Sequence, residues 1–159
     1  MAAMDSRAWI FATVAPDSFG SEIKIALEAL KTVSWVDTSR VVLAGTSEGE
    51  TAVARYDGRE FAARIVFARS CEDNFFVEAH GTRMIAEQPI LNVISAVDPF
   101  FSPANPWLDN PEAKGHCAAA FSDGKQAAVV LVPGALHTLL NMPQGRAFTR
   151  SFLEDMLKR

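Results

Sequence analysis

The segment Gly45–Gly49, of sequence GTSEG, places Ser47 between two glycines at the junction of a predicted strand and a predicted helix. A serine on such a tight turn exposes its hydroxyl above the edge of a sheet. The glycines allow the turn because a Cβ atom at either position would collide with the neighbouring strand or helix. The positive end of the helix dipole also favours negative charge that develops beside the serine. We therefore expect Ser47 to act as a nucleophile, with Gly45 and Gly49 forming the turn and the Glu48 backbone N–H serving as an oxyanion donor.

Two further polar residues follow strands later in the chain, and both could assist this serine. Asp98 follows the apolar run of residues 90–97, and His137 comes shortly after the run of residues 126–132. Catalytic groups collect at the carboxyl ends of the strands in open parallel sheets. We expect His137 to take the proton from Ser47, and Asp98 to orient the imidazole. The alternatives are a strand-end turn residue for Asp98, a solvated loop residue for His137, and an incidental serine in a tight connection.

Short apolar runs alternate with helical patterns along the chain, and these elements must position the three side chains. Runs that are apolar on both faces and separated by helices are typical of a parallel sheet that is covered on both sides. We therefore predict an α/β fold with a mostly parallel sheet and helices on both faces. The predicted strands are residues 9–14, 40–44, 63–68, 90–97 and 126–132; the predicted helices are residues 21–35, 48–56 (closed by a glycine stop at Asp57-Gly58), 77–87 and 145–158, and residues 100–115 form a proline-rich loop.

The composition is that of one globular domain and excludes several classes of protein. The chain has 159 residues, of which 49% are hydrophobic and 21% are charged, and its net charge is −4. These values predict that residues 1–159 form one folded domain rather than a disordered chain. The acidic balance argues against a nucleic-acid-binding protein, which would carry a basic face. No signal peptide or membrane span is visible, which predicts a cytoplasmic protein without a membrane partner.

From about Val14 onward, several short segments resemble the α/β-hydrolase superfamily, and most closely its dienelactone-hydrolase branch. The resemblance implies a partial α/β-hydrolase fold, from the C-terminal strands onward. It also implies hydrolysis of a carboxylic ester, lactone or similar acyl substrate through a Ser47–Asp98–His137 triad and an acyl-enzyme, without a metal or organic cofactor. Two departures stand out, because many relatives carry cysteine instead of Ser47 and a second glycine is frequent at Glu50. The resemblance is carried by residues 15–19, 22–27, 35–37, 45–49, 89–91 and 130–137.

The resemblance further implies that the first strands of the family, and the loop that supplies a second oxyanion donor, are absent from this chain. Loss of one such donor typically lowers the rate about 10²–10³-fold. A catalytically impaired remnant that acts as a binding or interaction domain is therefore an alternative function. The apolar edge near residues 9–14 would then be open to self-association. A flavodoxin-like binding domain is a third interpretation, although the chain lacks a glycine-rich phosphate loop.

Aromatic and cysteine residues near the predicted site have two interpretations each. Phe100, Phe101 and Trp107 follow the predicted acid, where they either cover the core or line the substrate site. Cys71 and Cys117 are expected to be buried free thiols, with a bridge between them as the minority hypothesis. No pair of cysteines or histidines has the spacing of a metal site, so no metal is expected.

Overall fold

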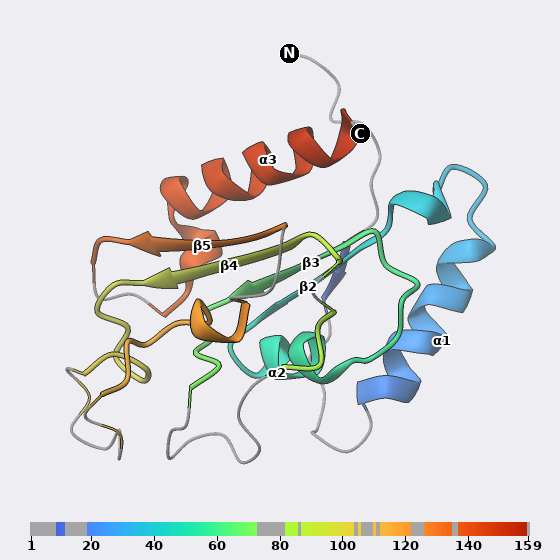
Figure 1. The fold of residues 1–159 in the computed structure, drawn as a ribbon. Coiled ribbons are helices and arrows are strands. Elements are labelled where there is room, and N and C mark those ends of the chain that lie inside the picture. Colours follow the sequence, from blue (N-terminus) through green and yellow to red (C-terminus); the bar gives the residue numbers. More distant parts are fainter. Residues whose placement is uncertain are drawn as a thin grey trace.

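The protein, described here from a computed structural model, contains a parallel sheet of five strands in the order β1-β2-β3-β4-β5 (Figure 1). The structure describes residues 9–11, 19–72, 82–85, 87–103, 105, 110, 112–121, 126–134 and 137–158. The strands are β1 (Trp9–Phe11), β2 (Val42–Thr46), β3 (Ala63–Phe67), β4 (Ile90–Ser95) and β5 (Ala127–Val132). The helices are α1 (Phe19–Lys31), α2 (Glu48–Arg55) and α3 (Pro143–Leu157), with the short 3₁₀ turns η1 (Thr38–Arg40), η2 (Ala119–Phe121) and η3 (Leu139–Asn141).

Helices cover both faces of the sheet, as the apolar strands predict. Alternate residues of a strand point to opposite faces, so Leu43 joins one core cluster while its neighbours Val42 and Ala44 join the other. The first cluster lies under α1 and α2, and the second lies under α3 (Figure 1). The predicted α/β fold class is confirmed. Among the described residues, no helix is long and apolar enough to cross a membrane.

Of the element boundaries that differ from the sequence prediction, two have a clear local reason. Helix α1 ends at Lys31 instead of near Trp35, because the N–H groups of Thr32 and Val33 bond to carbonyls only three residues back. Strand β2 begins at Val42 instead of at residue 40, because Asp37 caps a 3₁₀ turn with a hydrogen bond of 3.0 Å from the Ser39 N–H. Both differences come from short-range hydrogen bonds that the apolar pattern does not register.

The predicted helix over residues 77–87 is wrong where the structure describes it. Residues 82–85 and 87 are not helical, and residues 77–81 and 86 lie outside the described residues. The backbone N–H of Arg83 donates to the carbonyl of Ala54 in α2, at 2.8 Å, instead of to a carbonyl of its own segment. Met84 is buried against the core beside it. A hydrogen bond to α2, which is distant in the sequence, therefore replaces a helical bond expected for this segment.

The predicted glycine stop at Asp57-Gly58 is also wrong, because a buried arginine ends α2 instead. Tyr56 is already extended, with φ −68° and ψ 123°, and Gly58 has no positive φ. Arg64 of β3 is fully buried and donates to the carbonyls of Val53 (2.9 Å), Tyr56 and Gly58 (2.5 Å). A guanidinium at the carboxyl end of a helix satisfies free carbonyls and complements the dipole. Burial disfavours the charged form of Arg64 and so lowers its pKa. The hydrogen bonds to the carbonyls offset this loss of solvation.

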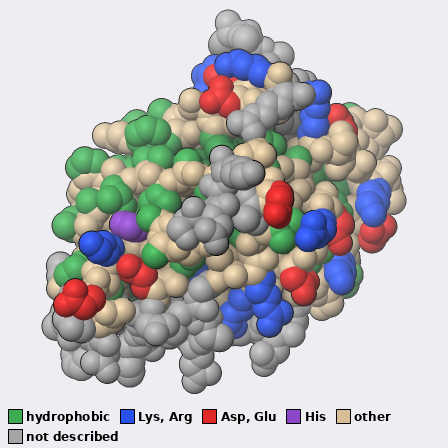
Figure 2. Space-filling model, viewed as in Figure 1, with side chains coloured by type: hydrophobic (Ala, Val, Ile, Leu, Met, Phe, Trp, Pro, Cys, Tyr) green, Lys and Arg blue, Asp and Glu red, His purple; other side chains and the backbone are tan. Residues whose placement is uncertain are grey.

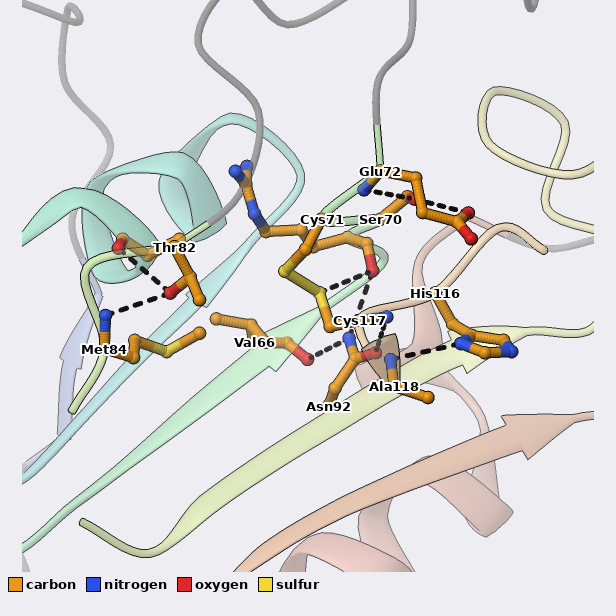
Figure 3. The surroundings of a disulfide bond; sticks show 12 residues. Val66, Ser70, Cys71, Glu72, Thr82, Met84, Asn92, His116, Cys117 and Ala118 are labelled. Atoms are coloured by element: carbon orange, nitrogen blue, oxygen red, sulfur yellow. Dashed lines mark hydrogen bonds between the residues drawn. A yellow bond between two sulfur atoms is a disulfide. The ribbon is translucent and has the colours of Figure 1, made fainter. Parts of the chain in front are cut away.

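The two cysteines form a disulfide, so the expected free thiols are a wrong prediction (Figure 3). Cys71 follows β3 and Cys117 precedes η2, and the bridge spans 46 residues of sequence. Asn92 of β4 supports the same junction, because its side chain accepts from the Cys117 N–H (3.2 Å) and donates to the Arg69 carbonyl (3.2 Å). The carboxylate of Glu72 accepts from two backbone N–H groups of the facing loop. Side-chain bonds and the disulfide thus fix this loop to the end of β3.

Replacing Arg64 should destabilise the fold, because three carbonyls, two of them on buried residues, would lose a donor. We expect Arg64→Met to lower the free energy of unfolding by roughly 2–4 kcal/mol, since each unsatisfied buried group costs about 1–3 kcal/mol. Arg64→Lys should lose less, since it keeps the charge. Urea unfolding followed by circular dichroism measures both. The exposed Arg150→Met variant is the control and should leave the midpoint unchanged. Equal midpoints for the two methionine variants would contradict the capping role.

Removing the disulfide should lower the free energy of unfolding by about 2–4 kcal/mol, the usual range for a loop of this length. We expect this loss in a Cys71→Ser/Cys117→Ser double variant, and in the native chain after addition of a phosphine reductant. The double variant should not respond to the reductant, which makes it the matched control. Thiol titration of the denatured, unreduced chain should find no free thiol. Two free thiols per chain would show that the bridge does not form.

Candidate active site

Ser47 occupies a strained turn between β2 and α2. Its φ is 53° and its ψ is −122°, a combination that is costly for a residue with a side chain. The turn is forced by the close approach of α2 to β2: a Cβ atom at Gly45 would lie 2.2 Å from the carbonyl oxygen of Gly49. Gly49 itself is buried in the first turn of the helix. The Ser47 side chain is left exposed at the carboxyl edge of the sheet.

His137 lies between Ser47 and Asp98 and is within hydrogen-bond distance of both. Its Nε2 is 3.0 Å from the Ser47 Oγ, and its Nδ1 is 2.9 Å from the Asp98 Oδ2. With the proton on Nδ1, the imidazole donates to the carboxylate and accepts from the serine hydroxyl. The three residues follow β2, β4 and β5, which all run parallel, so their carboxyl ends bring them to one edge. The structure therefore brings together all three residues that the sequence singles out.

Asp98 is fully buried and is held from both sides. Its Oδ1 accepts from the backbone N–H groups of Phe100 (2.9 Å) and Phe101 (3.2 Å), which leaves Oδ2 directed at the histidine. The loop after β4 thus sets the orientation of the carboxylate, and the carboxylate sets that of the ring. A fixed partner on Nδ1 selects the tautomer in which Nε2 can accept a proton.

The Glu48 N–H is the first of helix α2 and follows Ser47 directly. The first N–H groups of a helix have no acceptor within the helix. Since they lie at the positive end of the dipole, they suit a developing oxyanion next to the serine. The Glu48 side chain is exposed to solvent, so Glu48 contributes to this end of the helix through its backbone N–H.

Aromatic rings lie beside the histidine. The Phe100 ring meets the imidazole edge-on at 4.6 Å between centroids and is 42% exposed, a position suited to contact with a bound molecule. Phe101 is 6.1 Å away and buried, which suits its alternative interpretation as core cover. Trp107 lies outside the described residues. Figure 2 shows hydrophobic side chains gathered over the end of the molecule where β4 and β5 terminate. Leu131 near the end of β5 and Val97, two residues after β4, are both exposed.

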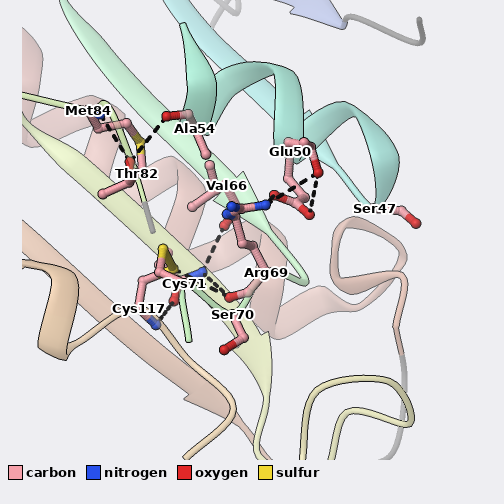
Figure 4. Close-up of polar contacts among 12 residues, drawn as sticks. Ser47, Glu50, Ala54, Val66, Arg69, Ser70, Cys71, Thr82, Met84 and Cys117 are labelled. Atoms are coloured by element: carbon pink, nitrogen blue, oxygen red, sulfur yellow. Dashed lines mark hydrogen bonds and ion pairs between the residues drawn. A yellow bond between two sulfur atoms is a disulfide. The ribbon is translucent and has the colours of Figure 1, made fainter. Parts of the chain in front are cut away.

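A buried ion pair beside Ser47 is the feature that the sequence analysis misses. Glu50 is only 2% exposed, and its Oε2 lies 2.7 Å from Nη1 of Arg69, which is fully buried (Figure 4). Burial raises the pKa of Glu50 to about 7, and Arg69 opposes that rise. By its position in the sequence, Glu50 is a first-turn residue favoured by the helix dipole, and this position does not predict a partner for it. Its place where the family often has glycine, together with an arginine just after a buried strand, is the signal that could have revealed the pair.

No metal centre is apparent in the described part of the chain, where no three His, Cys, Asp or Glu side chains gather as ligands. His116 instead accepts a hydrogen bond from the Ala118 N–H, at 3.2 Å. His80 lies outside the described residues. The site therefore consists of Ser47, His137 and Asp98, with the Glu50–Arg69 pair behind the serine.

Solved structures share this arrangement of strands and helices at low sequence identity. Arabidopsis thaliana SOBER1 aligns with a TM-score of 0.54 at 13% identity, over 92% of this chain and 68% of that one. A SOBER1 variant aligns with a TM-score of 0.55 at 14% identity, over 92% of this chain and 68% of that one. A protein from Xanthomonas campestris pv. campestris is assigned as a hydrolase of the α/β superfamily. It aligns with a TM-score of 0.53 at 19% identity, over 89% of this chain and 70% of that one. No family model matches the sequence, and a search of curated proteins finds no match. The chain has the fold of α/β-hydrolase-type proteins.

Adding a methyl group at Gly45 should separate α2 from β2 and displace Ser47. We expect Gly45→Ala to lower the free energy of unfolding by about 1–3 kcal/mol, the usual cost of overpacking, and to reduce reactivity at Ser47 strongly. Urea unfolding and labelling by a serine-directed phosphonate measure the two effects. Gly20→Ala in α1 is the matched control, because its Cβ atom would meet nothing within 4 Å. A stable Gly45→Ala variant with full labelling would show that the tight turn is not required.

Proposed function

We propose that this chain is a serine hydrolase that cleaves a carboxylic ester, lactone or similar acyl substrate through an acyl-enzyme. The observation that carries the proposal is the continuous pair of contacts from Ser47 Oγ to His137 Nε2 (3.0 Å) and from His137 Nδ1 to Asp98 Oδ2 (2.9 Å). The strained φ of Ser47 adds support, because such strain at an exposed polar residue is typical of functional sites. The hydrolase assignment of the Xanthomonas neighbour agrees with it.

The proposed reaction divides into two halves. In the first, Ser47 Oγ attacks the acyl carbon while His137 Nε2 takes the hydroxyl proton, and the tetrahedral oxyanion accepts from the Glu48 N–H. The intermediate then collapses: the bond to the leaving alcohol breaks, and the alcohol leaves with the proton from His137. In the second half, water repeats the attack on the acyl-enzyme and releases the acid and free Ser47. Asp98 stabilises the imidazolium in both halves.

This chemistry requires neither a metal nor an organic cofactor, because the attack, proton transfer and charge stabilisation all use protein groups. The substrate is a small acyl compound, and Phe100 beside His137 favours one that presents an apolar surface there. A dienelactone-hydrolase-like specificity remains our finer proposal, based on the sequence resemblance. The alternative is the catalytically impaired remnant, which would bind without turnover.

Three wider properties also remain proposals. We propose that residues 1–159 form one domain, and that chains self-associate through the edge of the sheet at β1, which among the described strands pairs with β2 alone. We propose neither a nucleic-acid partner nor a membrane partner. A cytoplasmic location stays a prediction from the sequence, although the Cys71–Cys117 disulfide is more typical of oxidising compartments.

A fluorophosphonate probe should label the native chain at Ser47, and Ser47→Ala should abolish the label. Asp98→Asn should keep the fold but lower hydrolysis of p-nitrophenyl acetate by roughly 10²–10⁴-fold, because the imidazole loses its orienting carboxylate. Ser151→Ala is the control, since this serine lies exposed on α3, and it should retain full labelling. A folded native chain without Ser47-dependent labelling would exclude the hydrolase and favour the binding domain.

A further inference from the structure

Glu50 shares the first turn of α2 with Ser47. Its backbone N–H donates to the Ser47 carbonyl, at 3.1 Å, so the carboxyl-bearing residue and the proposed nucleophile belong to one closed turn. The Glu50 side chain is 2% exposed and points away from solvent toward the end of β3 (Figure 4). A carboxylate in such a place needs a specific partner, because burial disfavours its charged form.

That partner, Arg69, is anchored independently of α2. It follows Ala68, whose φ of 56° turns the chain sharply after β3, and its own carbonyl accepts from Asn92 Nδ2 at 3.2 Å. The guanidinium reaches α2 at two points, Glu50 Oε2 at 2.7 Å and Thr51 Oγ1 at 3.3 Å. The pair therefore ties the turn that carries Ser47 to the segment after β3, which Asn92 of β4 also holds.

The net charge of the groups around His137 depends on whether Glu50 is ionised. When His137 carries a proton, the local set is Asp98 and Glu50, both negative, with Arg69 and His137, both positive. Loss of the Glu50 charge leaves one positive charge in excess in a buried region, where charges are poorly screened. The imidazolium that forms during acyl transfer would then lose its favourable interaction with the Glu50 charge.

We propose that Glu50 is a positioning residue for the Ser47–His137 couple: through its buried ion pair with Arg69 it holds the serine turn, and its charge cancels that of Arg69 so that His137 can carry the reaction's proton. This inference rests on the proposed hydrolase function. It extends that function, because it assigns a second carboxylate to the site in addition to Asp98.

The pair also makes the site sensitive to pH near neutrality. The groups that act on Glu50 are Arg69 after β3, Thr51 on its own helix and His137 after β5, and the pKa of Glu50 is about 7, raised by burial. Glu50 takes up a proton as the pH falls through this value, while Arg69 stays charged. Activity should therefore fall as the pH drops below about 7, because Glu50 then loses its charge.

The decisive variant is Glu50→Gln, which keeps the shape and an acceptor oxygen but removes the charge. We expect kcat/KM on the alkaline side to fall roughly tenfold, and the acid limb of its pH profile to move to lower pH by roughly one unit. The midpoint of the His137 imidazole titration, followed by NMR and assigned with a His137→Gln variant, should move the same way. Glu50→Asp should restore part of the rate. Glu154→Gln is the matched control, because Glu154 pairs with Arg150 at the same 2.7 Å but in solvent, and it should change neither readout.

The double variant Glu50→Gln/Arg69→Met keeps the test decisive if the single variant does not fold. It removes both charges, so the His137 titration midpoint should return toward that of the native chain. A purely structural role of Glu50 predicts a loss of stability while the His137 titration midpoint and the acid limb of the pH profile stay unchanged. An unchanged midpoint or an unchanged acid limb would overturn the proposal. The NMR readout does not need turnover. If the His137 titration is unchanged in Glu50→Gln while hydrolysis depends on Ser47, this inference fails and the proposed function stands. If Ser47 is unreactive in the native chain, the proposed function fails.

Discussion

The close approach of the first turn of α2 to the end of β2 is the constraint on which the rest of the site depends. There is no room for a Cβ atom at Gly45, where it would lie 2.2 Å from the Gly49 carbonyl oxygen. This packing forces Ser47 to a positive φ, and its hydroxyl lies 3.0 Å from His137 Nε2. A longer or looser connection would leave the serine as an ordinary cap residue, without access to the histidine.

Two buried arginines, Arg64 in β3 and Arg69 two residues after its end, hold α2 at both ends. Arg64 binds carbonyls at the carboxyl end of the helix, and Arg69 binds Glu50 and Thr51 in its first turn. Both guanidinium groups are fully buried. Buried charges are costly unless they are well bonded, so each arginine acts only in the one helix position that satisfies it. Two such contacts fix the helix along its length and thereby fix the turn that precedes it.

The remaining two members of the site depend on the loops that follow β4 and β5. Asp98 is oriented by two backbone N–H groups of its own loop, and His137 is oriented by Asp98. The Cys71–Cys117 disulfide and the Asn92 side chain tie the end of β3 to the segment before η2. The edge of the sheet that carries these three residues is thus built from several separately anchored segments. This arrangement suits a reaction that requires fixed distances between groups from distant parts of the chain.

The sequence by itself determined the parallel α/β fold and the three residues that meet, because apolar runs and strand-end polar residues are local patterns. It did not determine the end of α2, the extended segment at residues 82–85 or the disulfide, because each depends on a partner far along the chain. Arg64, Ala54 and Cys117 are such partners, and their distances are decided only when the strands assemble. The same holds for Glu50: its position predicts a first-turn carboxylate favoured by the helix dipole, and only the tertiary structure buries it against Arg69.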